Sequence, residues 1–215
     1  MQNIILIYPR VTPITFGRNV NIMPLSLLAL GSALEEAGFE VRIIDERMID
    51  RLTLTVREAL TPETVCVGIS TMTGYQIKGA LEAACAMRRA KPDLLIVWGG
   101  VHPSLLPEQT LKNELVDVVV IGPGEETFLE LVRTFVAGGH LERVRGIAFK
   151  QNGKTVITEP RAHPDLNAIP FPAYHQVPFD NYGSHLSEDN ERTLPVMTSR
   201  GCPFRCGYCY NLAFN

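Results

Sequence analysis

Residues 65–100 read VCVGISTMTGYQIKGALEAACAMRRAKPDLLIVWGG, and this stretch decides the fold. Two short apolar runs, Val65–Ser70 and Leu94–Trp98, enclose a longer segment with a helical pattern, Gln76–Ala90. The two runs are continuously apolar rather than alternating, which is typical of strands that are buried on both faces of a sheet. The stretch therefore predicts two parallel strands joined by a right-handed helical crossover.

The same alternation of short apolar runs and helical segments continues on both sides of this unit. The further elements that we expect are strands at 4–8, 40–45 and 117–121 and helices at 24–37, 52–60 and 126–136. Strands and helices that alternate in this way indicate a doubly wound, Rossmann-like α/β domain with a parallel sheet. We place this domain at residues 1–140.

The pattern changes after residue 140. Two β-like runs, 147–150 and 155–158, flank Asn152 and Gly153, and Asn-Gly between such runs is a strong hairpin signal. The following residues, up to about 193, are rich in Pro, His, Asp and Asn and indicate a linker that is ordered only where it packs. We assign residues 141–193 to the hairpin and this Pro-rich linker.

The last segment, residues 194–215, is expected to begin with a strand at 194–198 and then carries Cys202, Cys206 and Cys209. Cysteine thiolates hold iron–sulfur clusters, usually four to a cubane, so three with no fourth nearby indicate a [4Fe–4S] cluster with one open iron. Two other interpretations stay open. The cysteines could form part of a zinc site, or a disulfide plus a free thiol.

Composition and charge narrow the class of protein. The chain of 215 residues is 46% hydrophobic and 20% charged, enough to bury an ordinary core, and its net charge of −3 offers no broad attraction for nucleic acid or an anionic membrane. The N-terminus has no basic region before its short apolar run, so we expect neither a signal peptide nor a membrane span. Five cysteines, three of them clustered, fit a reducing compartment, and we expect a cytoplasmic protein with Cys66 and Cys85 in the core.

Three loops follow the expected strands of the α/β domain on the side where such sheets bind ligands, beyond the carboxyl ends of the strands. Their glycines would let a ligand approach the backbone, and their hydroxyl groups and helix N-termini could bind its polar atoms. The candidate binding residues in these loops are Ser70, Thr71, Met72, Gly99, Gly100, His102, Gly122, Gly124 and Glu125.

Each of these residues also has a simpler explanation. The glycines fit tight strand-to-helix turns whether or not a ligand binds. Met72 could fill the core, and His102 could be a surface residue in a turn. Glu125 stands at the start of a helix, where a carboxylate is favoured by the helix dipole alone.

The run Thr198–Tyr210, with Tyr208 directly before the last cysteine, resembles the signature of the radical S-adenosylmethionine (SAM) enzymes. The resemblance implies that the open iron chelates SAM and that one-electron reduction cleaves it to a 5′-deoxyadenosyl radical. It also implies an electron donor such as flavodoxin or ferredoxin, and it places Tyr208 in the cofactor site.

The glycine loops followed by this cysteine run resemble the cobalamin-binding radical SAM family, and most closely its branch of anaerobic magnesium-protoporphyrin IX monomethyl ester cyclases and radical methyltransferases. The resemblance implies cobalamin as a further cofactor and either methyl transfer or oxidative cyclisation of a small-molecule substrate that these residues do not identify. The roles that it implies are a groove for the nucleotide tail at Ser70, Thr71 and Met72, contact with that tail at Gly99 and Gly100, and closure of the corrin rim at Gly122, Gly124 and Glu125.

The first loop departs from the cobalamin-binding pattern. Residues 9–17 read PRVTPITFG and lack the histidine of the motif Asp-x-His-x-x-Gly, so we expect no histidine ligand on the lower face of cobalt. The resemblance also implies that residues 194–215 are only the start of a radical SAM barrel, so we expect a truncated chain that is inactive alone. Two alternatives remain: a cobalamin module with a vestigial cysteine tail, and a nucleotide-binding domain with a zinc or redox site.

Overall fold

A single sheet forms the centre of the computed structural model, which describes residues 1–11, 22–182 and 194–210. The strands of the sheet are β1 (Asn3–Tyr8), β2 (Glu40–Asp45), β3 (Thr64–Ser70), β4 (Leu95–Gly99), β5 (Val118–Val120), β6 (Ile147–Gln151) and β7 (Lys154–Ile157). The α-helices in the described ranges are α1 (Leu25–Glu36), α2 (Leu52–Ala59), α3 (Gln76–Ala90), α4 (Val101–Leu105), α5 (Pro107–Leu111) and α6 (Glu125–Val136).

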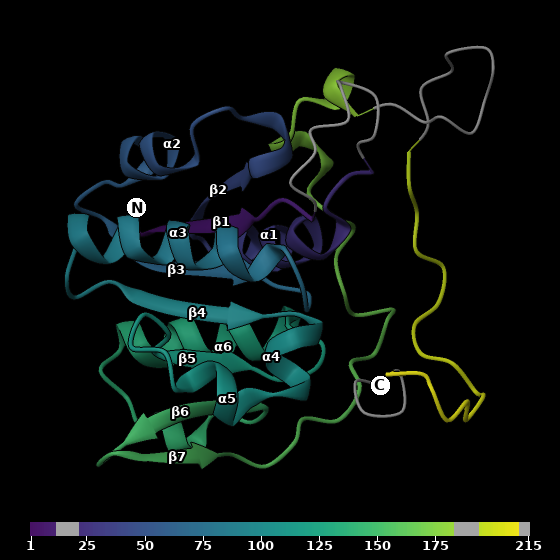
Figure 1. Ribbon diagram of the computed structural model, residues 1–215. Helices are drawn as coiled ribbons and strands as arrows, with labels where there is room; N and C mark the ends of the chain where they lie inside the picture. Colours follow the sequence, from purple (N-terminus) through teal and green to yellow (C-terminus); the bar gives the residue numbers. More distant parts are fainter. Residues whose placement is uncertain (12–21, 183–193, 211–215) are drawn as a thin grey trace.

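The strand order is β2-β1-β3-β4-β5-β6-β7, with parallel pairing from β2 through β5 and antiparallel pairing of β6 and β7 (Figure 1). β1 lies between β2 and β3, so the sheet grows from β1 first in one direction and then in the other. This arrangement confirms the doubly wound, mostly parallel α/β fold expected from the sequence.

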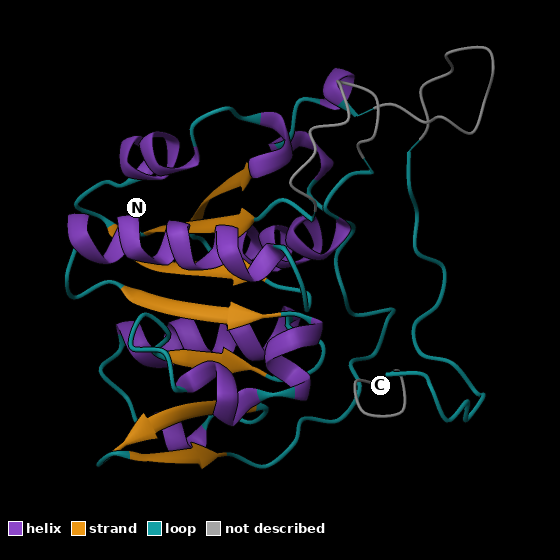
Figure 2. Ribbon diagram, viewed as in Figure 1, coloured by secondary structure: helices purple, strands orange, loops and turns teal. Residues whose placement is uncertain are grey.

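Helices cover both faces of the sheet (Figure 2). Each face carries its own apolar core, which explains why the strands are apolar throughout. On one face, Ile5 and Ile69 pack in a cluster with residues of α2 and α3. On the other face, Ile4 and Leu6 pack in a cluster with residues of α1 and α6. Successive side chains of a strand point to opposite faces, so each central strand supplies both cores.

The predicted hairpin forms and joins the same sheet. Asn152 and Gly153 both have positive φ, 51° and 75°, as a tight hairpin turn requires. β6 pairs with β5, so the sheet extends through residue 157, beyond residue 140 at which we ended the α/β domain. The hairpin covers an edge that a short parallel strand would otherwise leave open.

The expected strand at 194–198 is wrong. These residues have no regular secondary structure, and Val196 and Met197 are 61% and 51% exposed. An apolar run becomes a strand only when a neighbouring strand takes its backbone hydrogen bonds, and the described part of the chain pairs none with it. The helices α4 and α5 were not predicted, because five residues are too few to show a periodicity.

Only one of the two isolated cysteines lies in the core. Cys66 is fully buried, as expected, whereas Cys85 is only half-buried. Among the described residues, none of the helices combines the length and the apolar character needed to cross a bilayer.

Part of the Pro-rich linker packs against α1, and we call residues 171–182 the strap. The Ala173 amide donates to the Leu28 carbonyl at 3.0 Å, and the Ser32 hydroxyl donates to the Phe171 carbonyl at 2.6 Å. The strap lies beside α1 and the end of β2 (Figure 1), where Val177 and Tyr182 form an apolar cluster with Met23 and Leu28. It therefore fixes the linker to the β2 side of the sheet.

Candidate functional site

A cavity of about 330 Å³ lies at the carboxyl edge of the sheet, on the face covered by α1 and α6. Its floor is formed by the ends of β3, β4 and β5, and its volume is at the lower end of the range for small-molecule sites. The predicted residues that line it are Ser70, Gly99, Gly100, Gly122, Gly124 and Glu125. The structure thus brings the three glycine loops together around one cavity.

Gly100 holds two of these loops in close contact. Its φ is +96°, and a Cβ atom there would lie 2.9 Å from the Thr71 carbonyl oxygen and 3.1 Å from the Thr71 nitrogen. The Thr71 amide donates to the Gly99 carbonyl at 2.8 Å, and the His102 amide donates to the Thr71 carbonyl at 3.1 Å. Glycine at this position is therefore needed for the loops themselves, as well as leaving room for a ligand.

Ser104 connects the second loop to the third and was missed by sequence reasoning. Its hydroxyl donates to the Gly100 carbonyl at 2.7 Å and accepts from the Gly122 amide at 3.0 Å. Ser104 is buried in α4, a helix that the sequence pattern did not reveal. No signal in the sequence distinguished this serine from a surface residue.

Gly68 forms part of the cavity floor and was also missed. A Cβ atom there would lie 3.0 Å from both Leu6 Cδ2 and Phe128 Cζ. The glycine therefore gives Phe128 of α6 space to pack directly on β3. An isolated glycine inside a strand pattern signals a close approach of this kind, so this residue could have been found from the sequence.

Three of the predicted loop residues do not line the cavity. Thr71 is fully buried, and its hydroxyl has no partner among the described residues. Met72 is 50% exposed, so it is not a core residue, and its amide donates to Gln76 Oε1 at 2.8 Å. His102 is 7% exposed rather than a surface residue, and its Nδ1 lies 3.1 Å from Thr73 Oγ1. Burial lowers the pKa of the His102 imidazole.

Glu125 connects the cavity to the segment that precedes the cysteines. It is 6% exposed at the start of α6, and its Oε1 accepts a hydrogen bond from Arg200 Nη2. Its Oε2 is buried without a hydrogen-bond partner in the described chain. Met197, Ser199, Arg200 and Gly201 line the cavity as well, and none of these four was predicted.

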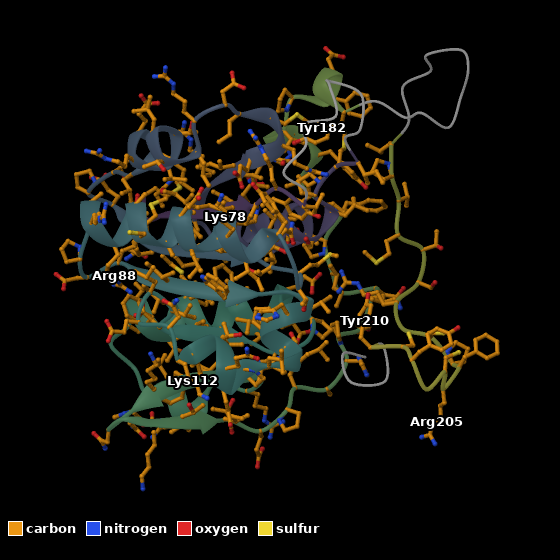
Figure 3. All side chains as sticks on the ribbon, viewed as in Figure 1. Lys78, Arg88, Lys112, Tyr182, Arg205 and Tyr210 are labelled. Carbon is orange, nitrogen blue, oxygen red and sulfur yellow. The ribbon has the colours of Figure 1, made fainter. Side chains whose placement is uncertain are left out.

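The cysteine segment lies outside the sheet, and its three thiols are not gathered at one point. Cys202 and Cys206 are exposed and Cys209 is half-buried. Within residues 1–11, 22–182 and 194–210, no three His, Cys, Asp or Glu side chains are grouped to hold a metal. Tyr208 is 94% exposed and far from fully packed, and Arg205 points away from the body of the protein (Figure 3).

The prediction that cobalt has no histidine ligand on its lower face depends on the loop after β1. Residues 12–17 of that loop lie outside the described residues, so the absence of a histidine there remains an observation on the sequence alone.

The comparison with known protein families identifies the domain in which this cavity lies. The family model described as "B12 binding domain" matches residues 14–132, more than half of the chain. The chain belongs to the B12-binding domain family. The matched residues include the helix α1, the first part of α6 up to residue 132 and the glycine loops, so the cavity lies inside the B12-binding domain except where residues 197–201 close it.

Curated relatives match beyond this domain. An uncharacterized methyltransferase of Pyrococcus horikoshii is 33% identical over 192 residues, which cover 86% of this chain and 40% of the relative. The anaerobic magnesium-protoporphyrin IX monomethyl ester cyclase of Synechocystis is 28% identical, with 89% of this chain and 38% of the relative covered. The chain thus spans about two-fifths of the length of these relatives, and it is related to the family suspected from the sequence.

Solved structures share the fold. The cobalamin-dependent SAM radical enzyme OxsB, with aqua-cobalamin and SAM bound, has a TM-score of 0.69 at 23% identity and covers 80% of this chain and 24% of its own. The radical SAM methyltransferase TsrM of Kitasatospora setae has a TM-score of 0.62 at 23% identity and covers 75% of this chain and 31% of its own.

The residues around the cavity fit part of a cobalamin. The floor is apolar where Leu27, Val97, Val120 and Phe128 line it, as in most small-molecule sites. Ser70 and Glu125 add polar atoms at its wall. A cavity of this volume accepts a nucleotide-sized group but not a whole corrin, so the residues fit the nucleotide tail of cobalamin rather than its ring.

We expect Gly100→Ala to destabilise the B12-binding domain, because the added methyl group meets the Thr71 backbone in a conformation that already disfavours alanine. The loss in the free energy of unfolding should be about 1–3 kcal/mol, the usual cost of backbone strain plus a forced shift. Urea unfolding followed by circular dichroism measures it. Gly38→Ala is the matched control, since Gly38 has a similar φ of +86° but nothing within 4 Å of its Cβ position. Equal losses in both variants would show that the Thr71 contact is irrelevant.

We expect His102 to make the folded state less stable in mild acid. Its folded pKa is lowered, so the unfolded chain takes up the proton first, and stability falls as the pH drops below the ordinary value of about 6.5. His102→Gln should remove this loss, so the stability difference between wild type and variant should shrink between pH 7.5 and 5.5. His140→Gln, at an exposed histidine, is the control. The same pH-dependent change in stability in both variants would contradict the assignment of the acid sensitivity to His102.

Proposed function

We propose that this chain binds cobalamin at the carboxyl edge of its sheet, with the nucleotide tail in the cavity and the corrin ring at its mouth. The observation that carries the proposal is the meeting of three interlocked glycine loops around one cavity inside the matched B12-binding domain. Gly99 and Gly100 would lie along the tail, while Gly122, Gly124 and Glu125 would form the wall nearest the ring. The Ser70 hydroxyl would donate or accept a hydrogen bond to the polar groups of the cofactor, and the buried Oε2 of Glu125 would accept one.

The cysteine segment would hold the second metal group. Three thiolates at this spacing are the donor set that a [4Fe–4S] cluster requires, so Cys202, Cys206 and Cys209 fit the group by chemistry. Cys202 and Cys206 are exposed and Cys209 is half-buried, and Tyr208 directly precedes Cys209, so it would lie beside the site. When bound, a cluster of this kind supplies the electron that cleaves SAM, and cobalamin carries the methyl group.

The reaction of the whole protein belongs to the proposal as well. Two relatives are named as a methyltransferase and a cyclase, and the chain spans about two-fifths of their length. We propose a cobalamin-dependent radical SAM methyl transfer or oxidative cyclisation on a small molecule, in a reducing cytoplasm with a flavodoxin-like or ferredoxin-like electron donor. The loop after β1 offers cobalt no histidine, so its lower face should lack this ligand.

We expect the purified chain to retain one hydroxocobalamin per molecule after anaerobic incubation and desalting, because the cavity buries the tail. Corrin absorbance relative to protein concentration measures this. Gly99→Leu should abolish retention, since a Cβ at Gly99 meets only Val120 Cβ at 3.9 Å and a large side chain there would occupy the cavity, whereas Gly153→Ala at the hairpin turn should retain the cofactor. No retention by a folded wild type would overturn the assignment and favour a different nucleotide-like ligand.

We expect anaerobic reconstitution with iron and sulfide to give four irons and four sulfides per chain and the absorbance of a cubane cluster. Replacing Cys202, Cys206 and Cys209 by alanine should remove it, while Cys85→Ala, outside the segment, should not. Iron analysis with absorbance and electron paramagnetic resonance measures the outcome. Binding of zinc instead of iron would favour a structural or redox site, and binding of neither would favour a cobalamin module with a vestigial tail.

A further inference from the structure

We propose that Tyr174 is a positioning residue that holds the start of the cysteine segment at a fixed place beside the cavity. This inference rests on the proposed cobalamin and cluster functions and adds the contact that sets the spacing between the two sites. Tyr174 belongs to the strap, and its hydroxyl donates to the Pro195 carbonyl at 2.7 Å. Pro195 shortly precedes both Met197, which lines the cavity, and Cys202, the first cysteine of the run.

The strap that carries Tyr174 is bound to α1 in one register. The Ala173 amide donates to the Leu28 carbonyl at 3.0 Å, and the Ser32 hydroxyl donates to the Phe171 carbonyl at 2.6 Å. The Leu28 carbonyl lies inside the helix, and a carbonyl has a second lone pair that can accept this additional bond. An apolar contact alone could slide along a helix, whereas these hydrogen bonds fix residue 173 beside residue 28. The strap is therefore a positioned element of the fold.

Gly31 makes room for a further contact between the strap and α1. A Cβ atom at Gly31 would lie 2.9 Å from Gln176 Oε1, so the Gln176 side chain lies directly over the helix backbone. Gln176 Nε2 donates to Glu35 Oε1, and His175 Nε2 lies 3.0 Å from Glu35 Oε2. Glycine inside a helix is less favourable than alanine, and here the docked Gln176 accounts for it. Two neighbouring residues of the strap thus bind one carboxylate of α1.

The far end of the strap is fixed to the ends of β1 and β2. The Tyr182 hydroxyl donates to Asp45 Oδ2 at 3.0 Å, and Asp45 Oδ1 accepts from Arg47 Nε at 2.9 Å. The Arg47 guanidinium lies 4.5 Å from the centre of the Tyr8 ring. Burial, and then the neighbouring Asp45 carboxylate, raises the pKa of Tyr182, so the donor keeps its proton at neutral pH. Tyr174 therefore lies between two fixed ends of the strap.

A second contact binds the same segment to the other helix of the cavity. Arg200 Nη2 donates to Glu125 Oε1 at the start of α6, and α6 packs on the same face of the sheet as α1. The segment is thus bound to both helices that wall the cavity, through the strap at Pro195 and directly at Arg200. Arg200 itself lines the cavity, so a change there would also alter contacts with a ligand. Tyr174 is not among the described residues that line it, so its hydroxyl tests position alone.

The spacing matters because two cofactors would act on one substrate. Reacting groups have to approach to about 3–3.5 Å, and a small misplacement far from the chemistry slows a reaction strongly. The bond from Tyr174 to Pro195 joins the helix that walls the cavity to the segment that carries the cysteines. It therefore acts on the separation of the two cofactors without touching either of them.

The first test measures the position of the segment in the protein without cofactors. Trp98 is the sole tryptophan and directly precedes Gly99 of the cavity, so it serves as the donor for energy transfer. The acceptor is a dansyl group on the exposed Cys202, in a chain whose other exposed or half-buried cysteines are replaced by serine. The time-resolved decay of tryptophan emission then gives the distribution of distances between the two groups.

We expect Tyr174→Phe to raise the population outside the main distance peak roughly fivefold, because one neutral hydrogen bond is lost. Gln176→Ala should broaden the distribution as well, since it loosens the strap on α1. Tyr75→Phe beside α3 and Gln109→Ala in α5 are the matched controls and should give the wild-type distribution. Unchanged distributions in both strap variants would overturn the proposal.

Hydrogen exchange separates the role of Tyr174 from the stability of the strap. The Ala173 amide, which donates to Leu28, should exchange faster in Gln176→Ala than in wild type. In Tyr174→Phe it should exchange at the wild-type rate, because the strap stays docked. Faster exchange of this amide in both variants would show that the hydroxyl stabilises the strap instead of positioning the segment, and would overturn the proposal.

The loaded protein tests the consequence for the cofactors. Pulsed electron paramagnetic resonance measures the dipolar coupling between cob(II)alamin and a reduced [4Fe–4S] cluster, and so their separation. We expect one separation in wild type and a broader range in Tyr174→Phe, with unchanged cobalamin and iron contents. Loss of cobalamin from this variant with an unchanged energy-transfer distribution would assign Tyr174 to cofactor binding and overturn the proposal. If wild type binds neither cofactor, the proposed function fails, while energy transfer still decides whether Tyr174 positions the segment.

Discussion

The constraint on which the structure depends is that its central strands must be covered by helices on both faces. Ile4 and Leu6 need one layer of helices, and Ile5 and Ile7 need the other, because alternate residues of β1 point to opposite sides. Right-handed crossovers then place every strand-to-helix loop at the same edge of the sheet. A ligand site at that edge follows from core packing before any binding residue is chosen.

The glycines at that edge could be predicted from the sequence because they mark the ends of apolar runs. Their partners could not. Ser104 links Gly100 to Gly122, but it lies in a helix too short to show a period. The strand expected at 194–198 failed for a related reason: an apolar pattern gives no information about whether a neighbouring strand exists to receive its hydrogen bonds.

The ion pair between Arg200 and Glu125 shows that the helix dipole explains only part of the surroundings of Glu125. A glutamate at the start of a helix is accounted for by the helix dipole, and sequence reasoning had no need of another partner. The structure adds an arginine that is 75 residues away along the chain. The burial of Glu125 therefore depends on a segment outside the helix, and its position at the cavity wall makes that dependence relevant to a ligand.

The residues that match the B12-binding domain family do not form the whole wall of the cavity. The matched region, residues 14–132, contains the floor and the glycine loops, whereas the remaining wall comes from residues 197–201. These wall residues directly precede the first cysteine of the proposed cluster. Gly201 lines the cavity and Cys202 follows it directly, so the cavity wall and the cysteine run are continuous in the chain. The position of this wall therefore depends on the segment that carries the cysteines and not on the packing of the sheet alone.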